Sequence, residues 1–353
     1  MDRYIGLDVH SQSCTLAVED ARGKRLDERV LDTNGKVLVA CLQGIAGTRH
    51  LCLEEGTQSA WLYELLEPHV AEVVVVQPEK RRGNKSDALD AWALAERLRT
   101  GAKTGRVFKA PRRFTALREA VRGYEMATKD LVRAKNRLRA AFRARGVSVA
   151  RGAFADPDRH ATEIKRLPSA QRRLADQLSE RLKTAIAAHE VAEIWLREQG
   201  EALPEVARLA TAPGIGLIRA AQVVAIVVAP ERFRTPRQFW SYCGLGVVTR
   251  SSADWGRDPS TGSWKRRPQT ATRGLNRNRN PLLKRVFKGA ATTVITSMPN
   301  HPLHADYERQ LTAGTKPNLA RLTLARRIAS AVLAMWKNKE DYDPVKQRPR
   351  TAA

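Results

Sequence analysis

Residues 3–107 alternate between segments with strand patterning and segments with helix patterning, and this order restricts that part of the chain to a mixed α/β fold. Three extended segments come first. An amphipathic stretch, a strand, a helix, a nearly continuously apolar strand and a final helix follow them. In order, the segments are YIGLDVH, SCTLAVED, KRLDERVLDT, 35–44, RHLCLE, 59–68, VAEVVVVQP and GNKSDALDAWALAERLR. An apolar run such as VAEVVVVQP is typical of a strand buried inside a parallel sheet.

A three-stranded meander followed by α-β-α-β-α is the order of a ribonuclease-H-like (RuvC-like) fold, in which acids meet at one sheet edge. The candidate acids are Asp8 inside the first apolar strand, Glu54 at the end of HLCLE, and the pair Asp87 and Asp90. Because residues three apart share one face of a helix, that pair can converge on a single point. Such carboxylates would bind Mg²⁺ or Mn²⁺, and two such ions can hold the attacking and leaving oxygens of a phosphoryl transfer.

The acids also have a simpler interpretation, because acids at strand ends and on exposed helix faces are most often only solvated. The identity of the second ligand is open between two neighbours. Glu54 directly follows Leu53 at the end of the apolar run, which favours it, and Glu55 is the alternative.

Positive charge is confined to the later part of the chain. Residues 1–110 hold 16 basic and 16 acidic residues, so the whole net charge of +25 belongs to residues 111–353. A neutral domain followed by a cationic body predicts a polyanionic partner, most simply nucleic acid. A ribosome-like or merely soluble basic protein is the alternative that charge leaves open.

The cysteines and the apolar runs indicate the compartment. Cys14, Cys41, Cys52 and Cys243 are scattered without CxxC spacing, so they predict reduced core residues and neither a zinc site nor a disulfide framework. The chain begins with a charged strand, and no apolar run approaches about 18 residues, which argues against secretion and membrane insertion. We therefore expect a cytoplasmic, nucleoid-associated protein.

Residues 111–200 are expected to form a helical hairpin or coiled coil. Two long stretches with heptad-like seams flank a polar loop at 146–167, and the second stretch begins at Pro168 and Ser169. Both an antiparallel hairpin and a dimerising coiled coil fit this pattern. The seams consist of Leu117, Val121, Tyr124, Thr128, Leu131, Lys135, Leu138 and Phe142, and of Ala175, Leu178, Leu182, Ala185, His189, Ala192 and Leu196. We predict that His189 is a packed residue of the seam.

Residues 201–340 have mostly helical patterning, with Pro/Gly/Ser-rich loops up to about residue 281, and 341–353 are expected to be a disordered tail. A PGIG turn in LATAPGIGLIRAAQVVAIV suits either a phosphate contact or an ordinary packing corner. From Trp264 to Lys288 there are nine basic residues and no acid, which fits either contacts with nucleic acid or a solvated surface. The candidate contacts are Lys265, Arg266, Arg267, Arg273, Arg277 and Arg279.

Together, these motifs resemble the transposases of the IS110 family, including its IS1111 group. YIGLDVH, LEEGT and NKSDALDA match the DEDD domain of that family, the last through its KTDxxDA motif. The segments APGIG, FWSYCGLGVVTRSSADW and TRGLNRNRNPLL are similar to its second domain. Val247 and Ala253 stand where the family has proline and glycine. The resemblance covers almost the entire chain.

The resemblance implies a DNA recombinase that excises and inserts a mobile element, with Mg²⁺ held by the four acids. It places Ser252 on the family's nucleophilic serine, with Ser251 one residue away. It also implies a guide RNA from the element and a homo-oligomer, either a dimer or a tetramer. Because base pairing would carry the sequence information, the cationic body would need no base-reading helix.

Three other functions remain compatible with parts of the sequence. A metal-dependent Holliday-junction nuclease would use the same acids but would hydrolyse DNA with water. An actin-like sugar kinase also begins with a strand ending in GxD, but its phosphate-binding turn is glycine-rich, whereas VHSQS has no glycine. A non-enzymatic RNA-binding protein would explain the charge and leave the acids unused.

Overall fold

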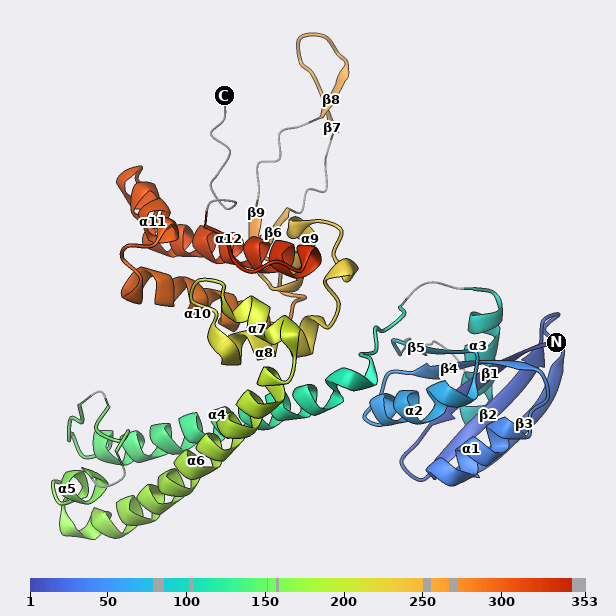
Figure 1. Ribbon diagram of the computed structural model, residues 1–353, viewed down its shortest axis with the longest axis horizontal. Helices are drawn as coiled ribbons and strands as arrows, with labels where there is room; N and C mark the ends of the chain where they lie inside the picture. The colour runs from blue at the N-terminus through green and yellow to red at the C-terminus, as the bar shows by residue number, and fades with distance from the viewer. Residues whose placement is uncertain are drawn as a thin grey trace. The chain divides into compact units, whose positions relative to one another are not determined.

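The structure is a computed structural model that describes residues 1–78, 86–101, 105–150, 152–156, 159–249, 255–266 and 272–344. The chain divides into two compact units, Met1–Arg112 and Arg113–Ala353, which we call unit 1 and unit 2 (Figure 1). Unit 1 is mixed α/β and unit 2 is mostly helical. The prediction that the N-terminal part is α/β and the C-terminal part mostly helical is therefore confirmed.

Unit 1 contains a five-stranded sheet with the order β3-β2-β1-β4-β5. Strands β1 (Asp2–Val9), β2 (Ser13–Asp20) and β3 (Arg25–Asp32) form an antiparallel meander. Strands β4 (Thr48–Glu54) and β5 (Glu72–Val76) continue the sheet parallel to β1. The predicted strands are thus all present, and the ends of β1 and β4 lie at the same edge of the sheet.

Helices cover both faces of this sheet. Helices α1 (Gly35–Gln43) and α2 (Ser59–Leu66), the latter continued by the 3₁₀ turn Glu67–His69, pack on the face formed by the side chains of Ile5, Leu7, Leu51 and Leu53. Helix α3 (Asp87–Arg99) packs on the opposite face. Its Leu94 and Leu98 lie with Cys52, Val74 and Val76, so each face has its own apolar core.

The close packing of α3 on the sheet depends on Gly6 in the middle of β1. A Cβ atom at this position would overlap the carbonyl oxygen of Ala91 and crowd the amide nitrogen of Ala95. Because strand side chains alternate between faces, Gly6 lies on the same face as Asp8, two residues later. The bare backbone at Gly6 therefore lets α3 lie directly against β1, next to Asp8.

Gly6→Ala is expected to destabilise unit 1 by about 1–3 kcal/mol, because the added methyl group pushes α3 off the strand. The free energy of unfolding can be measured from urea titrations followed by circular dichroism. Gly44→Ala is the matched control, since a Cβ there would make only ordinary van der Waals contacts with Cys41 and Ala40. Equal unfolding midpoints for the two variants would contradict the close contact.

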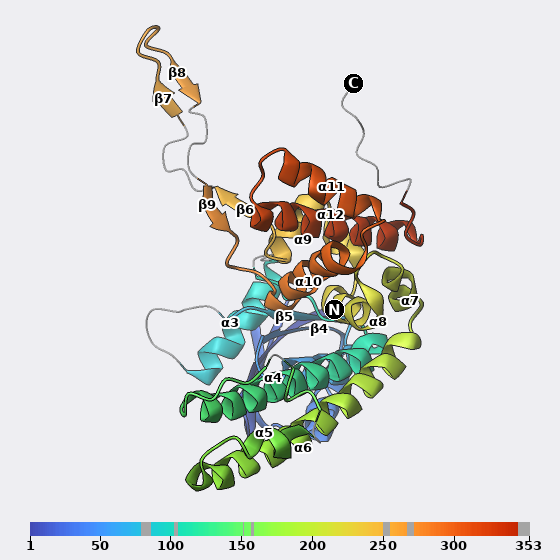
Figure 2. The same cartoon turned by 90° about the vertical axis from the view of Figure 1, so that its left-hand side faces the viewer.

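In unit 2, helices α4 (Thr115–Arg143) and α6 (Ser169–Glu201) pack along each other as an antiparallel pair within the chain (Figures 1 and 2). The ring of Tyr124 lies 5.0 Å from that of His189, as expected for a packed histidine. The most buried seam residues are Leu117, Val121, Leu138, Phe142, Ala175, Leu182 and Leu196. The seams are therefore used inside one chain, and association with a second chain stays a prediction.

The prediction of a polar loop at 146–167 is wrong in part. This segment contains the short helix α5 (His160–Ile164), and it buries Phe154, Ile164 and Leu167 against α4 and α6. His160 is also buried, and its Nδ1 lies 2.9 Å from the hydroxyl oxygen of Ser179. The apolar residues of this segment follow no helical or strand period, so their burial has no signature in the sequence.

The remainder of unit 2 is a helical body built around a long, largely buried helix, α12. The helices are α7 (Pro204–Ala210), α8 (Gly216–Val227), the 3₁₀ turn Pro230–Arg232, α9 (Pro236–Tyr242), α10 (Pro281–Ser297), α11 (Pro302–Thr312) and α12 (Pro317–Asn338). Among the described residues, no helix has the length and apolar character needed to cross a membrane. All four cysteines are buried and free, as predicted.

Four short strands replace part of the loop that the sequence predicted before residue 281. Strand β6 (Val247–Thr249) pairs with β9 (Thr272–Leu275), and β7 (Trp255–Arg257) pairs with β8 (Trp264–Arg266). The predicted tail also begins with an ordered contact, because the amide of Tyr342 donates to Thr211 Oγ1 at 3.0 Å. Residues 345–353 of that tail lie outside the described residues.

Candidate functional site

The start of α3 brings two acids to the end of β1. Ser86 caps the helix, since its Oγ accepts a hydrogen bond from the amide of Leu89 at 3.3 Å. Asp87 and Asp90 occupy the first turn, where negative side chains interact favourably with the positive end of the helix dipole. Because α3 is fixed against β1 at Gly6, this first turn lies beside Asp8.

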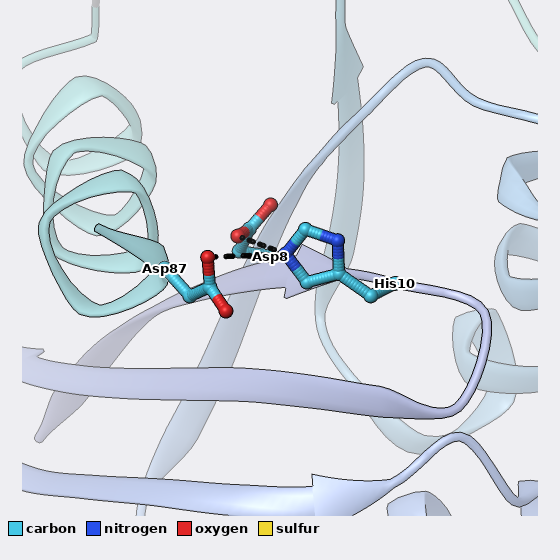
Figure 3. Close-up of side chains that lie close together, drawn as sticks. All are labelled: Asp8, His10 and Asp87. Carbon is cyan, nitrogen blue, oxygen red and sulfur yellow. Dashed lines mark ion pairs between the residues drawn. The ribbon is translucent and has the colours of Figure 1, made fainter. Parts of the chain in front are cut away.

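Asp8, His10 and Asp87 form a compact group in which each residue offers one ligand atom, and these atoms all lie within 4.8 Å of one another (Figure 3). His10 Nε2 lies 3.2 Å from Asp8 Oδ2 and 3.3 Å from Asp87 Oδ1, so the imidazole is placed between the two carboxylates. The side chain of Asp8 is 14% exposed, whereas those of His10 and Asp87 are 49% and 57% exposed. The predicted convergence of the first-strand acid with the helix is therefore present.

The surroundings of Asp8 favour a bound cation. Burial raises the pKa of the Asp8 carboxyl, the neighbouring His10 opposes this change, and the negative charges of Asp90 and Asp87 raise the pKa further. A positive charge close to Asp8 would offset the effects of burial and of the two neighbouring acids. Two carboxylates and an imidazole at this spacing fit a divalent metal ion, which would supply that charge.

His10 is a site residue that sequence reasoning missed. It lies just after β1, where its amide donates to the carbonyl of Ser13 at 2.9 Å and closes the turn into β2. The available signal was its spacing, since residues two apart in an extended segment share a face and His10 follows Asp8 by two.

Glu54 shares the face of Asp8 but stands outside the three-residue group. In β4, Leu51 and Leu53 point into the core under α1 and α2, so Cys52 and Glu54 point toward the α3 side. Leu7 pairs with Leu53 in the parallel register, which places Glu54 beside Asp8 at the sheet edge. Both acids line one pocket of about 220 Å³. Among the described residues, neither Glu54 nor Asp90 supplies an atom to the compact group around His10.

Glu55, the alternative to Glu54, has a cationic partner. Its Oε2 lies 2.5 Å from Lys109 Nζ, and Lys109 also donates to Ser59 Oγ at 2.9 Å. The side chain of Lys109 is only 9% exposed, whereas that of Glu55 is 40% exposed, so the lysine is the covered member of this ion pair. A carboxylate that already neutralises a buried lysine is poorly suited to hold a metal ion.

The predicted serine lies outside the described residues, as does its neighbour Ser251. The turn before them is well anchored. Gly244 has a φ of 67°, and a Cβ there would overlap the side chain of Arg279. The next residue, Leu245, accepts a hydrogen bond from Arg326 Nε at 2.8 Å. The turn at Gly244, which precedes β6, is therefore held in place by α12 and by the segment before α10.

The predicted basic contacts fall into different environments. Lys265 Nζ pairs with Asp258 Oδ2 at 2.5 Å. Arg279 is half-buried, and its Nη1 donates to the carbonyl of Asn276 at 3.2 Å, so this residue supports the Gly244 turn. Arg277 is exposed. The backbones of Arg266 and Arg273 belong to β8 and β9, and Arg267 lies outside the described residues.

The PGIG turn between α7 and α8 is a close packing point. A Cβ at Gly214 would overlap the carbonyl oxygen of Ala290 in α10, so the packing alternative accounts for this glycine. Gly216 has open space around its Cα and begins α8. The start of α8 opens into a pocket that Arg197, Arg219 and Arg285 line, which keeps a phosphate contact compatible with the turn.

Comparison with known families agrees with this arrangement. A family model for the DEDD domain of IS110 transposases, described as a transposase, matches residues 5–144. A second model, described as the transposase IS116/IS110/IS902 family, matches residues 206–308. No curated protein matches the chain. The first match includes all four candidate acids, and the second includes the segment with the serines. The chain therefore belongs to the IS110 family of transposases, which are DNA-processing enzymes.

Proposed function

We propose that this transposase cuts and rejoins DNA with a divalent cation, Mg²⁺ or Mn²⁺, held by Asp8, Glu54, Asp87 and Asp90 in a ribonuclease-H-like unit 1. The observation that carries the proposal is the approach of Asp8 and Asp87 to the same imidazole nitrogen of His10. The order of strands and the shared face of Asp8 and Glu54 support it. When bound, such a cation stabilises the negative charge that develops on phosphate oxygens.

The residues of unit 1 have separate tasks in this proposal. Asp8 provides the most buried carboxylate of the group, and Asp87 closes the site from the start of α3. His10 holds the two carboxylates toward one point. Glu54 and Asp90 add further negative charge at this sheet edge. The charge of Asp90 raises the pKa of the Asp8 carboxyl, and Glu54 lines the same pocket as Asp8.

Ser252 is the proposed nucleophile. Its Oγ forms an ester bond with a DNA phosphorus while one phosphorus–oxygen bond of the backbone breaks. The hydroxyl proton leaves the serine, and the departing sugar oxygen takes up a proton. A sugar hydroxyl of another DNA end then reverses the step, so that strands are rejoined and the serine is released. The match of the family model over this segment supports this assignment.

A guide RNA is the second proposed partner beside DNA. Unit 2 belongs to the region that holds the whole net charge of +25, which suits contacts with phosphates. Base pairing would then select the DNA sites, while the protein supplies backbone contacts and chemistry.

We also propose that the chain forms a homo-oligomer through the outer faces of α4 and α6. Apolar residues remain exposed there even though the seams are paired within the chain. They include Met126, Val132, Leu174, Val191 and Ile194, which are 51–67% exposed. Exposed apolar side chains on this helical pair suit contact with a second copy.

Val191→Lys combined with Ile194→Lys is expected to reduce the mass in solution to that of the monomer, because charges would be buried at an apolar contact. Light scattering measures this mass. Thr312→Lys with Ala313→Lys is the matched control, since both residues are exposed at the end of α11, on a different helix from the proposed contact. A mass equal to that of the parent protein in both variants would refute an oligomer built on this face.

An excision assay tests the function as a whole. A plasmid that carries the gene with its flanking DNA is kept in cells that express the protein, and the rejoined flanks are amplified. A precise junction that requires the protein is the expected result. Double-strand breaks without any rejoined junction would favour a hydrolytic nuclease, and intact plasmid would contradict the proposal.

A further inference from the structure

A small hairpin in unit 2 has two unlike faces. Strands β7 and β8 pair with Trp255 opposite Arg266, Gly256 opposite Lys265 and Arg257 opposite Trp264. Because side chains of paired residues share a face, Trp255, Arg257 and Trp264 lie on one face, and Gly256 and Lys265 on the other. Among the described strands, β7 and β8 pair only with each other.

The face of Lys265 carries an ion pair within the hairpin. Gly256 is buried, and Lys265 forms its ion pair with Asp258 at the start of the turn. The hydrogen bond from Lys265, together with hydrogen bonds from Ser260, lowers the pKa of the Asp258 carboxyl. Asp258 also accepts from the amide of Ser260 at 2.9 Å, and Gly262 supplies the positive φ that the turn requires. The hairpin therefore has a defined turn and a satisfied charge pair.

The opposite face leaves two large aromatic side chains in the open. Trp255 is 59% exposed and Trp264 is 66% exposed. They are diagonal neighbours across the two strands, so their backbones are about 7–8 Å apart. Arg257 lies beside them and is also exposed. Exposed aromatic rings grouped with a cation are typical of an interaction surface and are costly without a partner.

We propose that this face binds a nucleic-acid strand with unpaired bases, in which Trp255 and Trp264 stack on bases and Arg257 contacts the phosphate backbone. Charge selects this partner, because the face offers Arg257 and no acid, and the only acid of the hairpin already pairs with Lys265. From Trp264 to Lys288 the chain also contains nine basic residues and no acid, which disfavours a cationic second copy. Stacking on tryptophan is tolerant of base identity, so the contact suits strands of any sequence.

This inference rests on the proposed function, since it assigns one surface through which the transposase would hold its nucleic acids. The basic run alone suggested Lys265 as a contact with nucleic acid, whereas this inference assigns the contact to Trp255, Arg257 and Trp264 on the other face of the hairpin. The hairpin would bind the bases of a strand by stacking, whereas the other basic residues of unit 2 would attract the phosphates of that strand by their charge. The two contributions differ in their dependence on salt.

The test measures binding of the full-length protein to labelled single strands of about 20 nucleotides, oligo-dT and oligo-U, by fluorescence anisotropy. Trp255→Ala and Trp264→Ala are each expected to weaken binding about 5- to 100-fold, with an unchanged salt slope. The phenylalanine variants should keep most of the affinity, because they retain a ring. Arg257→Gln should reduce the salt slope by about 0.7. A loss on RNA, on DNA or on both supports the inference and identifies the strand.

Trp61→Ala is the matched control, because Trp61 is a comparably open tryptophan in α2, 42% exposed, outside the hairpin. Unchanged affinity in the Trp255 and Trp264 alanine variants would overturn the inference, and so would phenylalanine variants as weak as the alanine ones. A lower mass in light scattering for the double alanine variant would instead assign the face to a second copy. If Asp8→Asn still excises DNA, the proposed function fails, whatever the hairpin binds.

Discussion

Replacing Asp8 with asparagine is expected to abolish excision, with a loss of about 1,000-fold or more, while binding to DNA and RNA stays intact. The asparagine keeps the shape of the side chain but removes the charge that a hard cation needs. Asp8 is the least exposed of the three grouped residues, and its carboxylate lies 3.2 Å from His10 Nε2 at the centre of the group. Excision frequency and nucleic-acid affinity are measured on the same preparations.

Asp32→Asn is the matched control, because it makes the same chemical change at the exposed end of β3. A second readout separates metal binding from activity. Addition of Mn²⁺ should raise the unfolding temperature of the parent protein, and this increase should be absent in Asp8→Asn. Excision by Asp8→Asn at the level of the parent protein would refute the proposed metal site.

The comparison of Glu54→Gln with Glu55→Gln resolves the choice between the two neighbours. Glu54→Gln should lose excision, whereas Glu55→Gln should keep it, because Glu55 is engaged by Lys109.

Ser252→Ala is expected to bind nucleic acid normally but to form no covalent link with DNA. The reason is chemical, since alanine has no oxygen that could form an ester with phosphorus. The measurement is peptide mapping of protein–DNA adducts trapped in the presence of Mg²⁺. The parent protein should yield one modified peptide, and Ser252→Ala should yield none.

Ser251→Ala is the natural control for this experiment, because it removes a neighbouring hydroxyl and should leave the adduct in place. An adduct on Ser251 would shift the assignment by one residue. A link to Tyr242, which lies in α9 shortly before this segment, would replace the serine mechanism altogether. Strand cleavage without any adduct would support hydrolysis by water.

Much of unit 1 was predictable because its elements are long enough to show their period. Asp8 interrupts an otherwise apolar strand, VAEVVVVQP is nearly continuously apolar, and α3 combines a serine cap with apolar spacing. The meeting of Asp8 with Asp87 also followed from element order. The choice of Glu54 could be supported only when the register of β4 beside β1 was visible, since a shift by one residue exchanges the faces.

Other features had no local signature. For His10 the spacing of two residues from Asp8 was the only signal, and it was too weak to single out a histidine at a strand end without the distances to the two carboxylates. Strands β7 and β8 have three residues each, too few for alternation to appear between turn residues. The burial of Phe154 and His160 depends on the pairing of α4 with α6, which is a property of distant parts of the chain.

The origin of the grouped acids has a consequence for the timing of activity during protein synthesis. Asp8 belongs to the first strand of unit 1 and Asp87 to its last helix. Domains fold as units while the chain leaves the ribosome, N-terminal part first. An unfinished chain that ends before α3 therefore has half of the centre and cannot assemble the rest. In the proposed mechanism, cleavage also awaits the translation of Ser252, so an unfinished chain cannot cut the DNA that encodes it.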